Sequence, residues 1–269
     1  MVTKKQRFDK IARDIKSVKI QGARNIAKRA LYAYNLIPTK ASKQKLCSLR
    51  PTEPMLHRVL AEAEKQPYSK ILKHFDSAQE KINKHTLKLV KNSDVIFTHC
   101  HSTNVVNALI NAKKRGKKFE VYNTETRPLF QGRKTARELK RAGIKVTQFV
   151  DSALGVALSK EQDTKKADKV FLGADAITKK GAINKIGSEV IAQIAKNQKI
   201  PVYIIADSWK FSKTKVELEK RNLAEIWKRV PKNIRIKNLS FEFVPKKYIK
   251  GIVSEYGVLS FDNFVRRVI

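Results

Sequence analysis

The sequence predicts an α/β fold, in which a helical N-terminal part precedes a mainly parallel β-sheet with helices on both faces. The first third of the chain repeats apolar residues at three- and four-residue spacing, which is typical of amphipathic helices. From Ser93 onward, short β-branched runs alternate with helical runs, and this alternation is typical of parallel sheets. At 269 residues and 42% hydrophobic content, the chain can bury a core. We therefore expect a helical domain over residues 1–91 and an α/β domain over residues 92–269.

The N-terminal elements are predicted from their periodicity. Residues 10–20 (KIARDIKSVKI) and 25–37 (NIAKRALYAYNLI) both have helical spacing, and Gly22 separates them. Residues 38–54 carry proline and serine and are expected to form a connection. Helical patterns resume over residues 55–91.

The elements of the sheet domain follow in order. Strands are expected over 95–99, 119–123, 146–150, 169–172 and 202–206, helices over 103–115, 135–142, 152–159 and 187–197, and weaker strands over 241–244 and 251–254. Because ligands of parallel sheets bind beyond the carboxyl ends of the strands, every motif that follows a strand is a candidate for the functional site.

Composition limits the class of protein. We find no apolar run long enough to cross a bilayer and no secretory signal, and Cys47 and Cys100 are too far apart in sequence to suggest a disulfide framework, so we expect a cytoplasmic protein without a membrane partner. The net charge of +34 suits nucleic-acid binding or a generally basic surface. Since the lysines are spread along the chain without a basic tail, we do not expect nucleic acid as a specific partner.

The motif THCHS places a cysteine between two histidines at the end of a predicted strand. Cys100 then lies close to a helix N-terminus and beside two imidazoles, and both favour the thiolate. The residues leave three interpretations open: a reactive base or nucleophile, a buried structural cysteine, and part of a zinc site.

The motif VFLGADAITKKGAINKIG places an acid at the end of another strand. Asp175 is expected at the same edge of the sheet as Cys100, where partial burial can raise its pKa so that it donates a proton. The alternative is an ordinary aspartate that accepts hydrogen bonds in a turn. Lys185 could pair with Asp175 or bind a phosphate.

Three further motifs supply groups that bind phosphate. Arg127 in TETRP brings a guanidinium to the same edge, and Arg50 precedes a proline in RPT. Gly22 opens a helix whose free N–H groups could hold a phosphate, with Arg24 adding positive charge. Lys210 follows the strand that ends in ADSWKF.

Together these motifs suit proton transfer on a phosphorylated small molecule. Hydride transfer and nucleotide hydrolysis fit less well, because neither a G-x-G-x-x-G motif after the first strand nor a Walker-type loop occurs.

The spaced set THCHS, TETRP…QG, GADAI…NKIG and WKF resembles the archaeal ribose-1,5-bisphosphate isomerases. These belong with the initiation factor 2B regulatory subunits and the methylthioribose-1-phosphate isomerases. The resemblance implies a Rossmann-like second domain, a homo-oligomer (dimer or hexamer), and no metal or organic cofactor. The sequence departs from the family pattern in two places. Gln21 stands where the family has arginine, and the span between Arg50 and Cys100 is shorter than in the family.

The resemblance also implies residue roles. Cys100 matches the catalytic base and Asp175 the catalytic acid of the conversion of ribose 1,5-bisphosphate to ribulose 1,5-bisphosphate. The implied phosphate and sugar contacts are Gly22, Ala23, Arg50, Asn184, Lys185 and Lys210. Two alternatives remain: a non-catalytic regulatory subunit that contacts initiation factor 2, and charge-driven RNA binding.

Overall fold

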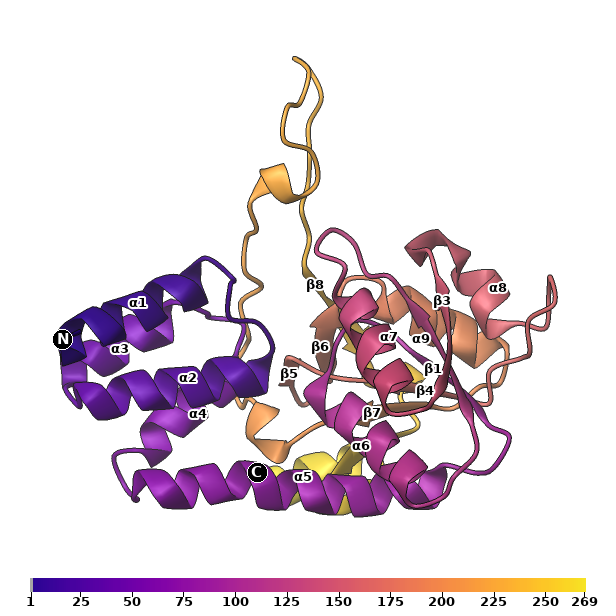
Figure 1. Cartoon of the computed structure of the whole chain (residues 1–269), viewed down its shortest axis with the longest axis horizontal. Coiled ribbons are helices and arrows are strands. Elements are labelled where there is room, and N and C mark those ends of the chain that lie inside the picture. The colour runs from indigo at the N-terminus through magenta and orange to yellow at the C-terminus, as the bar shows by residue number, and fades with distance from the viewer. Residues whose placement is uncertain (1) are drawn as a thin grey trace.

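The computed structural model describes residues 2–269 and begins with a group of helices (Figure 1). They are α1 (Lys4–Lys16), α2 (Ala23–Leu36), α3 (Lys40–Ser48), α4 (Pro54–Glu62) and α5 (Tyr68–Leu89). The prediction of a connection over residues 38–54 was wrong for its first half, which forms α3. Thr39 caps this helix by accepting a hydrogen bond from the Ser42 amide, and Leu46 buries its side chain.

The sheet that follows has the expected topology. Its strands are β1 (Val95–Thr98), β2 (Glu120–Thr124), β3 (Lys145–Phe149), β4 (Lys169–Leu172), β7 (Val202–Ile205), β9 (Gly251–Ser254) and β10 (Gly257–Leu259). Their order is β10-β9-β7-β4-β1-β2-β3, and every pairing is parallel except that of β10 with β9. The mainly parallel sheet is therefore confirmed, and its parallel strands end at one shared edge.

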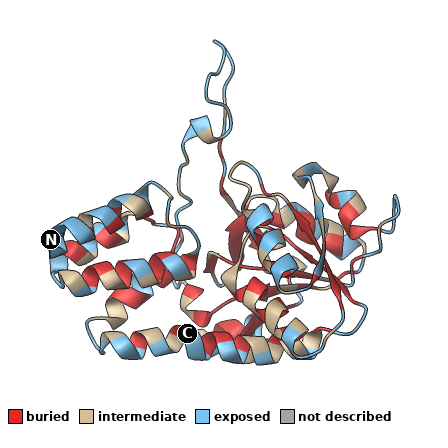
Figure 2. Ribbon diagram, in the orientation of Figure 1, coloured by how far each residue is buried: buried red, intermediate tan, exposed pale blue. Residues whose placement is uncertain are grey.

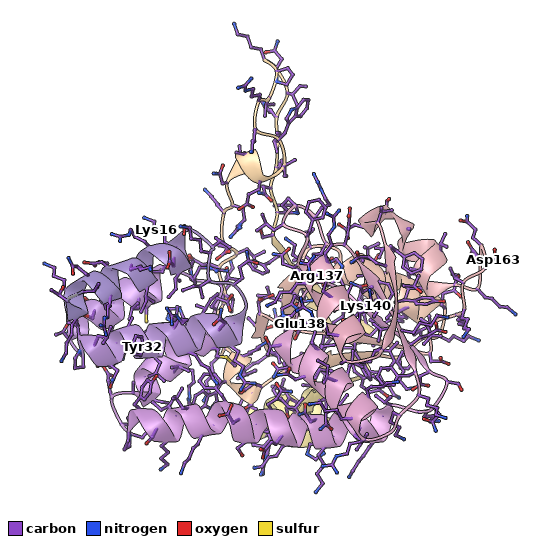
Figure 3. The ribbon with its side chains drawn as sticks, in the orientation of Figure 1. Lys16, Tyr32, Arg137, Glu138, Lys140 and Asp163 are labelled. Carbon is purple, nitrogen blue, oxygen red and sulfur yellow. The ribbon has the colours of Figure 1, made fainter. Side chains whose placement is uncertain are left out.

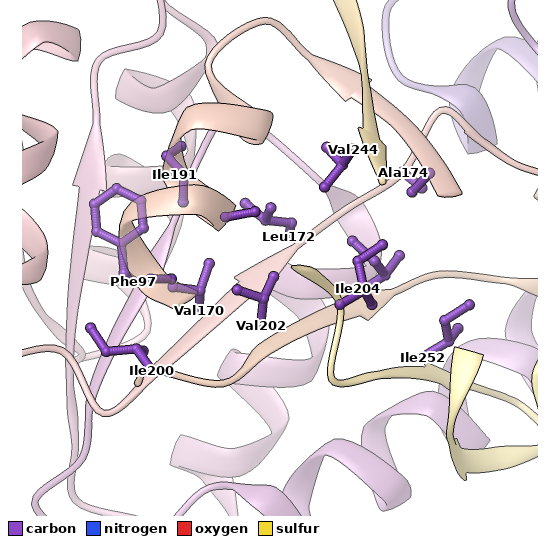
Figure 4. Close-up of a cluster of buried hydrophobic side chains, with 14 of the residues drawn as sticks. Phe97, Val170, Leu172, Ala174, Ile191, Ile200, Val202, Ile204, Val244 and Ile252 are labelled. Carbon is purple, nitrogen blue, oxygen red and sulfur yellow. The ribbon is translucent and has the colours of Figure 1, made fainter. Parts of the chain in front are cut away.

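Helices cover both faces of this sheet. They are α6 (Thr103–Lys114), α7 (Gln131–Arg141), α8 (Leu154–Leu158), α9 (Ser188–Asn197) and α10 (Phe261–Val268). Alternate strand residues point to opposite faces, so Phe97 packs with α8, α9 and α10, whereas Ile96 packs with α5, α6 and α7. Figure 4 shows the first of these two cores, in which Phe97, Val170 and Leu172 lie beside Ile191 of α9.

A second, antiparallel sheet was not predicted as such. It contains β5 (Ala176–Ile177), β6 (Gly181–Lys185) and β8 (Phe241–Pro245) in the order β5-β6-β8. Short 3₁₀ turns complete the chain: η1 (Asp151–Ala153), η2 (Ser208–Lys210), η3 (Leu223–Glu225) and η4 (Lys246–Tyr248). The antiparallel sheet carries the segment after β4 across the carboxyl edge of the large sheet.

Residues 213–239 form a long projection between η2 and β8, which we call the arm (Figure 1). Most of the arm is exposed (Figure 2), including the large apolar side chains Leu223, Ile226 and Trp227. Its two limbs meet at an isolated bridge between Lys220 and Leu239. Its base, by contrast, packs against the body of the protein.

Charged side chains cover the outside of the molecule (Figure 3), with Lys16, Arg137 and Lys140 among the labelled cations. Between residues 2 and 269, no helix is both long and apolar enough to cross a membrane. The domain boundary expected at residues 91/92 stays a prediction. The helix before it, α5, packs on α6 and on β9 as well as on α2.

A candidate active site at the carboxyl edge of the sheet

A cleft lies between the N-terminal helices and the carboxyl edge of the sheet. The structure brings nine of the ten predicted site residues to its walls: Gly22, Ala23, Arg24, Arg50, Cys100, Asp175, Asn184, Lys185 and Lys210. Gly173 allows the two strand-end loops to approach, because a Cβ there would lie 2.6 Å from Ser102 Cβ. The thiol and the carboxyl group named from the sequence therefore share one cavity.

The backbone of Cys100 is fixed in an uncommon conformation shortly after β1. Its φ of 65° lies in the left-handed region, which costs a non-glycine residue about 1–2 kcal/mol. Two hydrogen bonds hold it there: the Cys100 N–H donates to Thr126 Oγ1 at 3.0 Å, and the Thr135 hydroxyl donates to the Cys100 carbonyl at 2.8 Å. The position of the thiol is thus determined by contacts with two neighbouring segments.

The protonation state of Cys100 differs from the expectation. Burial raises the pKa of its thiol to about 12, while the Lys185 ammonium acts to lower this pKa. Burial also lowers the pKa of His99 and of His101 to about 4, so both imidazoles are neutral near pH 7. The expectation that flanking imidazoles favour a thiolate was wrong, because burial removes the positive charge on which it depended.

Hydrogen bonds assign the tautomers of the two imidazoles. His99 Nε2 donates to the Ile186 carbonyl at 2.8 Å, and its Nδ1 accepts from the Thr124 hydroxyl. Since the Thr135 hydroxyl proton is used on the Cys100 carbonyl, His101 Nδ1 must donate to Thr135 Oγ1, at 3.0 Å. Both rings are therefore neutral, and their hydrogen bonds help to hold the backbone around Cys100 in place.

Asp175 and Glu53 make up the acidic part of the cleft. Burial raises the pKa of Asp175, against the opposing effects of Lys210 and Arg50. Glu53 is 1% exposed, and burial together with the Asp175 charge raises its pKa to about 8. Such carboxyl groups can hold a proton at neutral pH, which suits a general acid.

Cations surround these acids. Lys210 Nζ donates to the Ala174 carbonyl at 2.6 Å, and Arg50 Nε lies 2.6 Å from a Glu219 carboxylate oxygen. Arg24 bonds Asp76 at 2.8 Å, on the outer side of the cleft. Lys185 is 4% exposed, and among residues 2–269 its ammonium has neither a hydrogen-bond acceptor nor an ion-pair partner within range. Lys185 is therefore the cation in the cleft that is best able to accept an anionic ligand.

The first turn of α2 adds uncharged donors. Gly22 is its N-cap at φ 82°, a conformation that glycine adopts without strain, and no side chain caps the helix. The N–H groups at the start of the helix thus remain available for an anion. On the opposite wall, Asn184 Nδ2 donates to Ser188 Oγ at 2.8 Å, which fixes the amide beside Lys185.

Arg127 does not join this set. Its N–H donates to Asp151 Oδ2 at 2.6 Å, and its exposed guanidinium lies 4.9 Å from the centre of the Phe130 ring. The structure therefore corrects the prediction that Arg127 reaches the same site as Cys100. The loop after β2 turns its side chain to solvent.

Four charged residues of the cleft were missed from the sequence: Glu53, Lys134, Glu219 and Arg221. Glu219 and Arg221 come from the base of the arm, where Thr52 Oγ1 donates to the Glu217 carbonyl at 2.7 Å. Glu53 stands in the RPTEP stretch and could have been noticed beside Arg50. For the arm residues, no local pattern indicated a contact with a segment so distant in the sequence.

Comparisons with known proteins place these features in context. The model of the initiation factor 2 subunit family matches residues 17–261. The ribose 1,5-bisphosphate isomerase of Thermococcus kodakarensis is 34% identical and is covered over 89% of its length by 93% of this chain. An eIF-2B subunit 2-like protein of Pyrococcus furiosus is 28% identical, with 93% of this chain and 95% of that protein covered. Among solved structures, the translation initiation factor eIF-2B of Pyrococcus horikoshii OT3 superposes with a TM-score of 0.82 at 26% identity, covering 95% of this chain and 97% of that one.

Proposed function

Because this chain belongs to the initiation factor 2 subunit family, we propose that it acts as a ribose 1,5-bisphosphate isomerase and forms ribulose 1,5-bisphosphate for nucleotide (AMP) salvage. The observation that carries the proposal is the presence of Cys100 and Asp175 in one cationic cleft. The relatives named as ribose 1,5-bisphosphate isomerases support this substrate. The reaction takes place in the cytoplasm, in a homo-oligomer (dimer or hexamer).

The proposed reaction moves three protons. The protonated Asp175 donates to the ring oxygen, and the bond from this oxygen to C1 breaks. The Cys100 thiolate removes the proton from C2, which leaves an enol-type species across C1 and C2. The C2 hydroxyl then returns a proton to Asp175 while the Cys100 thiol protonates C1, which gives the ketone and restores both groups.

Cys100 must lose its proton before it can act as the base. Its raised pKa makes the thiolate rare at neutral pH, and Lys185 is the cation that acts most strongly against this rise. The thiolate is also a strong base once formed, which suits abstraction of a proton from carbon. We therefore expect the turnover rate to increase with pH above neutrality.

The two phosphates need positive charge at both ends of the substrate. The free N–H groups of α2, with Arg24 beside them, suit one phosphate, and Lys185 suits the other. Arg50 and Lys210 also line the cleft and supply further donors. The net charge of +34 would also steer a bisphosphate to the cleft.

The direct test is to incubate the purified protein with ribose 1,5-bisphosphate and to measure ribulose 1,5-bisphosphate. We expect turnover in the unmodified protein and a loss of about 10²–10⁴-fold in kcat in Cys100→Ser and in Asp175→Asn, with substrate binding largely retained. Cys47→Ser is the matched control, because Cys47 lies outside the cleft, and it should keep full activity. Full activity in Cys100→Ser, or no turnover in the unmodified protein, would refute the proposal.

The second candidate is a non-catalytic regulatory subunit that binds a sugar phosphate and contacts initiation factor 2. The similarity to the eIF-2B of Pyrococcus horikoshii OT3 favours it. This candidate predicts binding of ribose 1,5-bisphosphate without turnover, together with co-purification of initiation factor 2. The same assay on the same preparation therefore separates the two candidates.

A further inference from the structure

A second cluster of ionisable side chains lies outside the cleft, where α5 meets the large sheet. His74 belongs to α5, Asp207 follows β7, and Glu255 lies in the turn between β9 and β10. One nitrogen or oxygen atom of each lies within 4.8 Å of the corresponding atoms of the other two. From this juxtaposition we propose that His74, Asp207 and Glu255 bind one divalent transition-metal ion, of which Zn²⁺ is the best fit.

The charge balance of the cluster supports a cation. Asp207 is 3% exposed, and its carboxylate contacts the His74 imidazole, with Nε2 lying 3.1 Å from Oδ1. Within residues 2–269, neither Asp207 nor Glu255 forms a salt bridge with lysine or arginine, although the chain has 58 of these cations and 24 acids. Because carboxylate oxygens of Asp207 and Glu255 lie within 4.8 Å of each other, their like charges repel, and a bound cation would remove this repulsion.

The three side chains are already held in place by other contacts. The His74 ring stacks on Trp209 with the ring centres 3.6 Å apart and the planes 6° from parallel. Asp207 Oδ1 accepts from the Trp209 N–H at 2.9 Å, and Glu255 accepts from both the N–H and the hydroxyl of Ser208. Each carboxylate oxygen can accept a further interaction, so these contacts orient the ligands and leave lone pairs for a metal.

The ligand set selects the class of ion. One imidazole nitrogen and two carboxylate oxygens, completed by water, suit Zn²⁺ and to a lesser degree Mn²⁺. Mg²⁺ and Ca²⁺ prefer sites made of oxygen alone. His74 would coordinate through Nε2, the atom that now contacts both Asp207 oxygens at 3.1 and 3.2 Å, and its proton would then reside on Nδ1.

The position of the cluster gives the metal a structural role. Asp207 caps η2, and the same turn ends in Lys210, which reaches the Ala174 carbonyl in the cleft. An ion shared by His74, Asp207 and Glu255 would therefore fix η2 against α5 and the β9–β10 turn. This inference does not depend on the proposed isomerase activity.

The test is a Zn²⁺ titration of the full-length protein after dialysis against EDTA. We expect one equivalent to bind, to raise the thermal midpoint, and to change the fluorescence of Trp209, which can be followed alone in a Trp227→Phe background. Mn²⁺ should bind more weakly than Zn²⁺, and Mg²⁺ should give no shift at the same concentration.

Variants identify the ligands. His74→Ala and Glu255→Gln should each weaken Zn²⁺ binding at least about tenfold, as even changes near metal ligands commonly do. His85→Ala is the control, because it removes an imidazole from the same helix outside the cluster. If His74→Ala does not fold, Glu255→Gln, which keeps the shape of the side chain, decides the question.

The measurements must also distinguish binding by these three ligands from binding by a cysteine. Cys100→Ser should leave Zn²⁺ binding unchanged, and a Co²⁺-loaded protein should lack a sulfur-to-cobalt charge-transfer band. Binding that survives both His74→Ala and Glu255→Gln, binding that is lost in Cys100→Ser, or no binding of one equivalent would overturn the proposal.

Discussion

Cys100 combines a strained backbone with a thiol that stays protonated. The left-handed φ and the bonds to Thr126 and Thr135 fix where the sulfur lies, whereas burial decides that it carries a proton. The two effects have different origins, since the first depends on neighbouring segments and the second on the removal of water. In a site of this kind, the fraction of thiolate depends on nearby positive charge and on the exclusion of water, rather than on an adjacent imidazolium.

The raised pKa of Cys100 predicts its reactivity. In a Cys47→Ala background, the rate of alkylation by iodoacetamide should still rise between about pH 8 and pH 10, because the thiolate fraction keeps increasing well above the ordinary thiol pKa of about 8.5. Peptide mass spectrometry measures the rate at each pH. Lys185→Met should react more slowly at every pH, because it removes the ammonium that favours the thiolate. A rate that levels off below about pH 8.5 would contradict this prediction.

Two glycines form a matched pair for stability. Gly187 has a φ of 101°, and a Cβ there would lie 3.2 Å from His99 Nε2, so Gly187→Ala should lower the free energy of unfolding by about 1–3 kcal/mol. Gly155 lies in α8 with nothing within 4 Å of an added Cβ, so Gly155→Ala should raise this free energy by up to about 1 kcal/mol. Urea denaturation measures both, and equal effects of the same sign would show that the difference in backbone conformation is unimportant.

Among the elements, the arm differs most from the rest of the molecule. Its tip makes few contacts and exposes Trp227 and Ile226, yet its base places Glu219 and Arg221 in the cleft. Arg221 pairs with both Glu225 and Glu219, and Glu219 also pairs with Arg50, so a chain of ion pairs joins the arm to the N-terminal helices. The base is thus a wall of the site, and the tip is a separate, exposed surface.

The arm should be the first segment that trypsin cuts. Lys228, Arg229 and Lys232 are exposed and lie outside regular structure, whereas the lysines of α5 are protected by helical hydrogen bonds. Gel electrophoresis under denaturing conditions should show two fragments that still elute together in native size exclusion, because β8 and β9 remain paired with β6 and β7. Early cleavage within α5 would be inconsistent with this view of the fold.

The accuracy of the sequence predictions varied with the length and regularity of the elements. The buried runs at residues 95–98 and 169–172 were located to within one residue, because short β-branched runs between polar turns are typical of buried strands. The helix α3 was missed because proline and serine near its ends suggested a loop, although Thr39 is a good cap. The two residues of β5 are too few for any period to show.

The candidate site was predictable only in part, for a physical reason. Residues at strand ends, such as Cys100 and Asp175, could be brought together by topology alone, because parallel strands end at one edge. Glu219 depends on a contact with Arg50 that joins an irregular segment to a distant turn, and no local pattern encodes it. The pKa of Cys100 depends on burial by the whole fold, so the motif alone suggested the wrong direction.

At the scale of the whole molecule, repulsion among the positive charges should be the main electrostatic contribution to stability. With a net charge of +34, added salt screens repulsion among the many cations that ion pairs leave uncompensated. The thermal midpoint should therefore rise by a few degrees between about 0.05 M and about 0.5 M NaCl, as differential scanning calorimetry can show. Sucrose controls for general solute effects. A midpoint that falls with salt would mean that ion pairs such as Arg50–Glu219 outweigh the repulsion.

The packing of α5 has a consequence for how the protein is made. This helix buries Ile82 in the core that includes Val253 of β9, and it contacts both β9 and β10, which are encoded near the other end of the sequence. While the chain emerges from the ribosome, α5 exists long before residues 251–259 have been translated. Its apolar face must stay partly uncovered during most of synthesis, so maturation of this protein is completed only after those residues have left the exit tunnel.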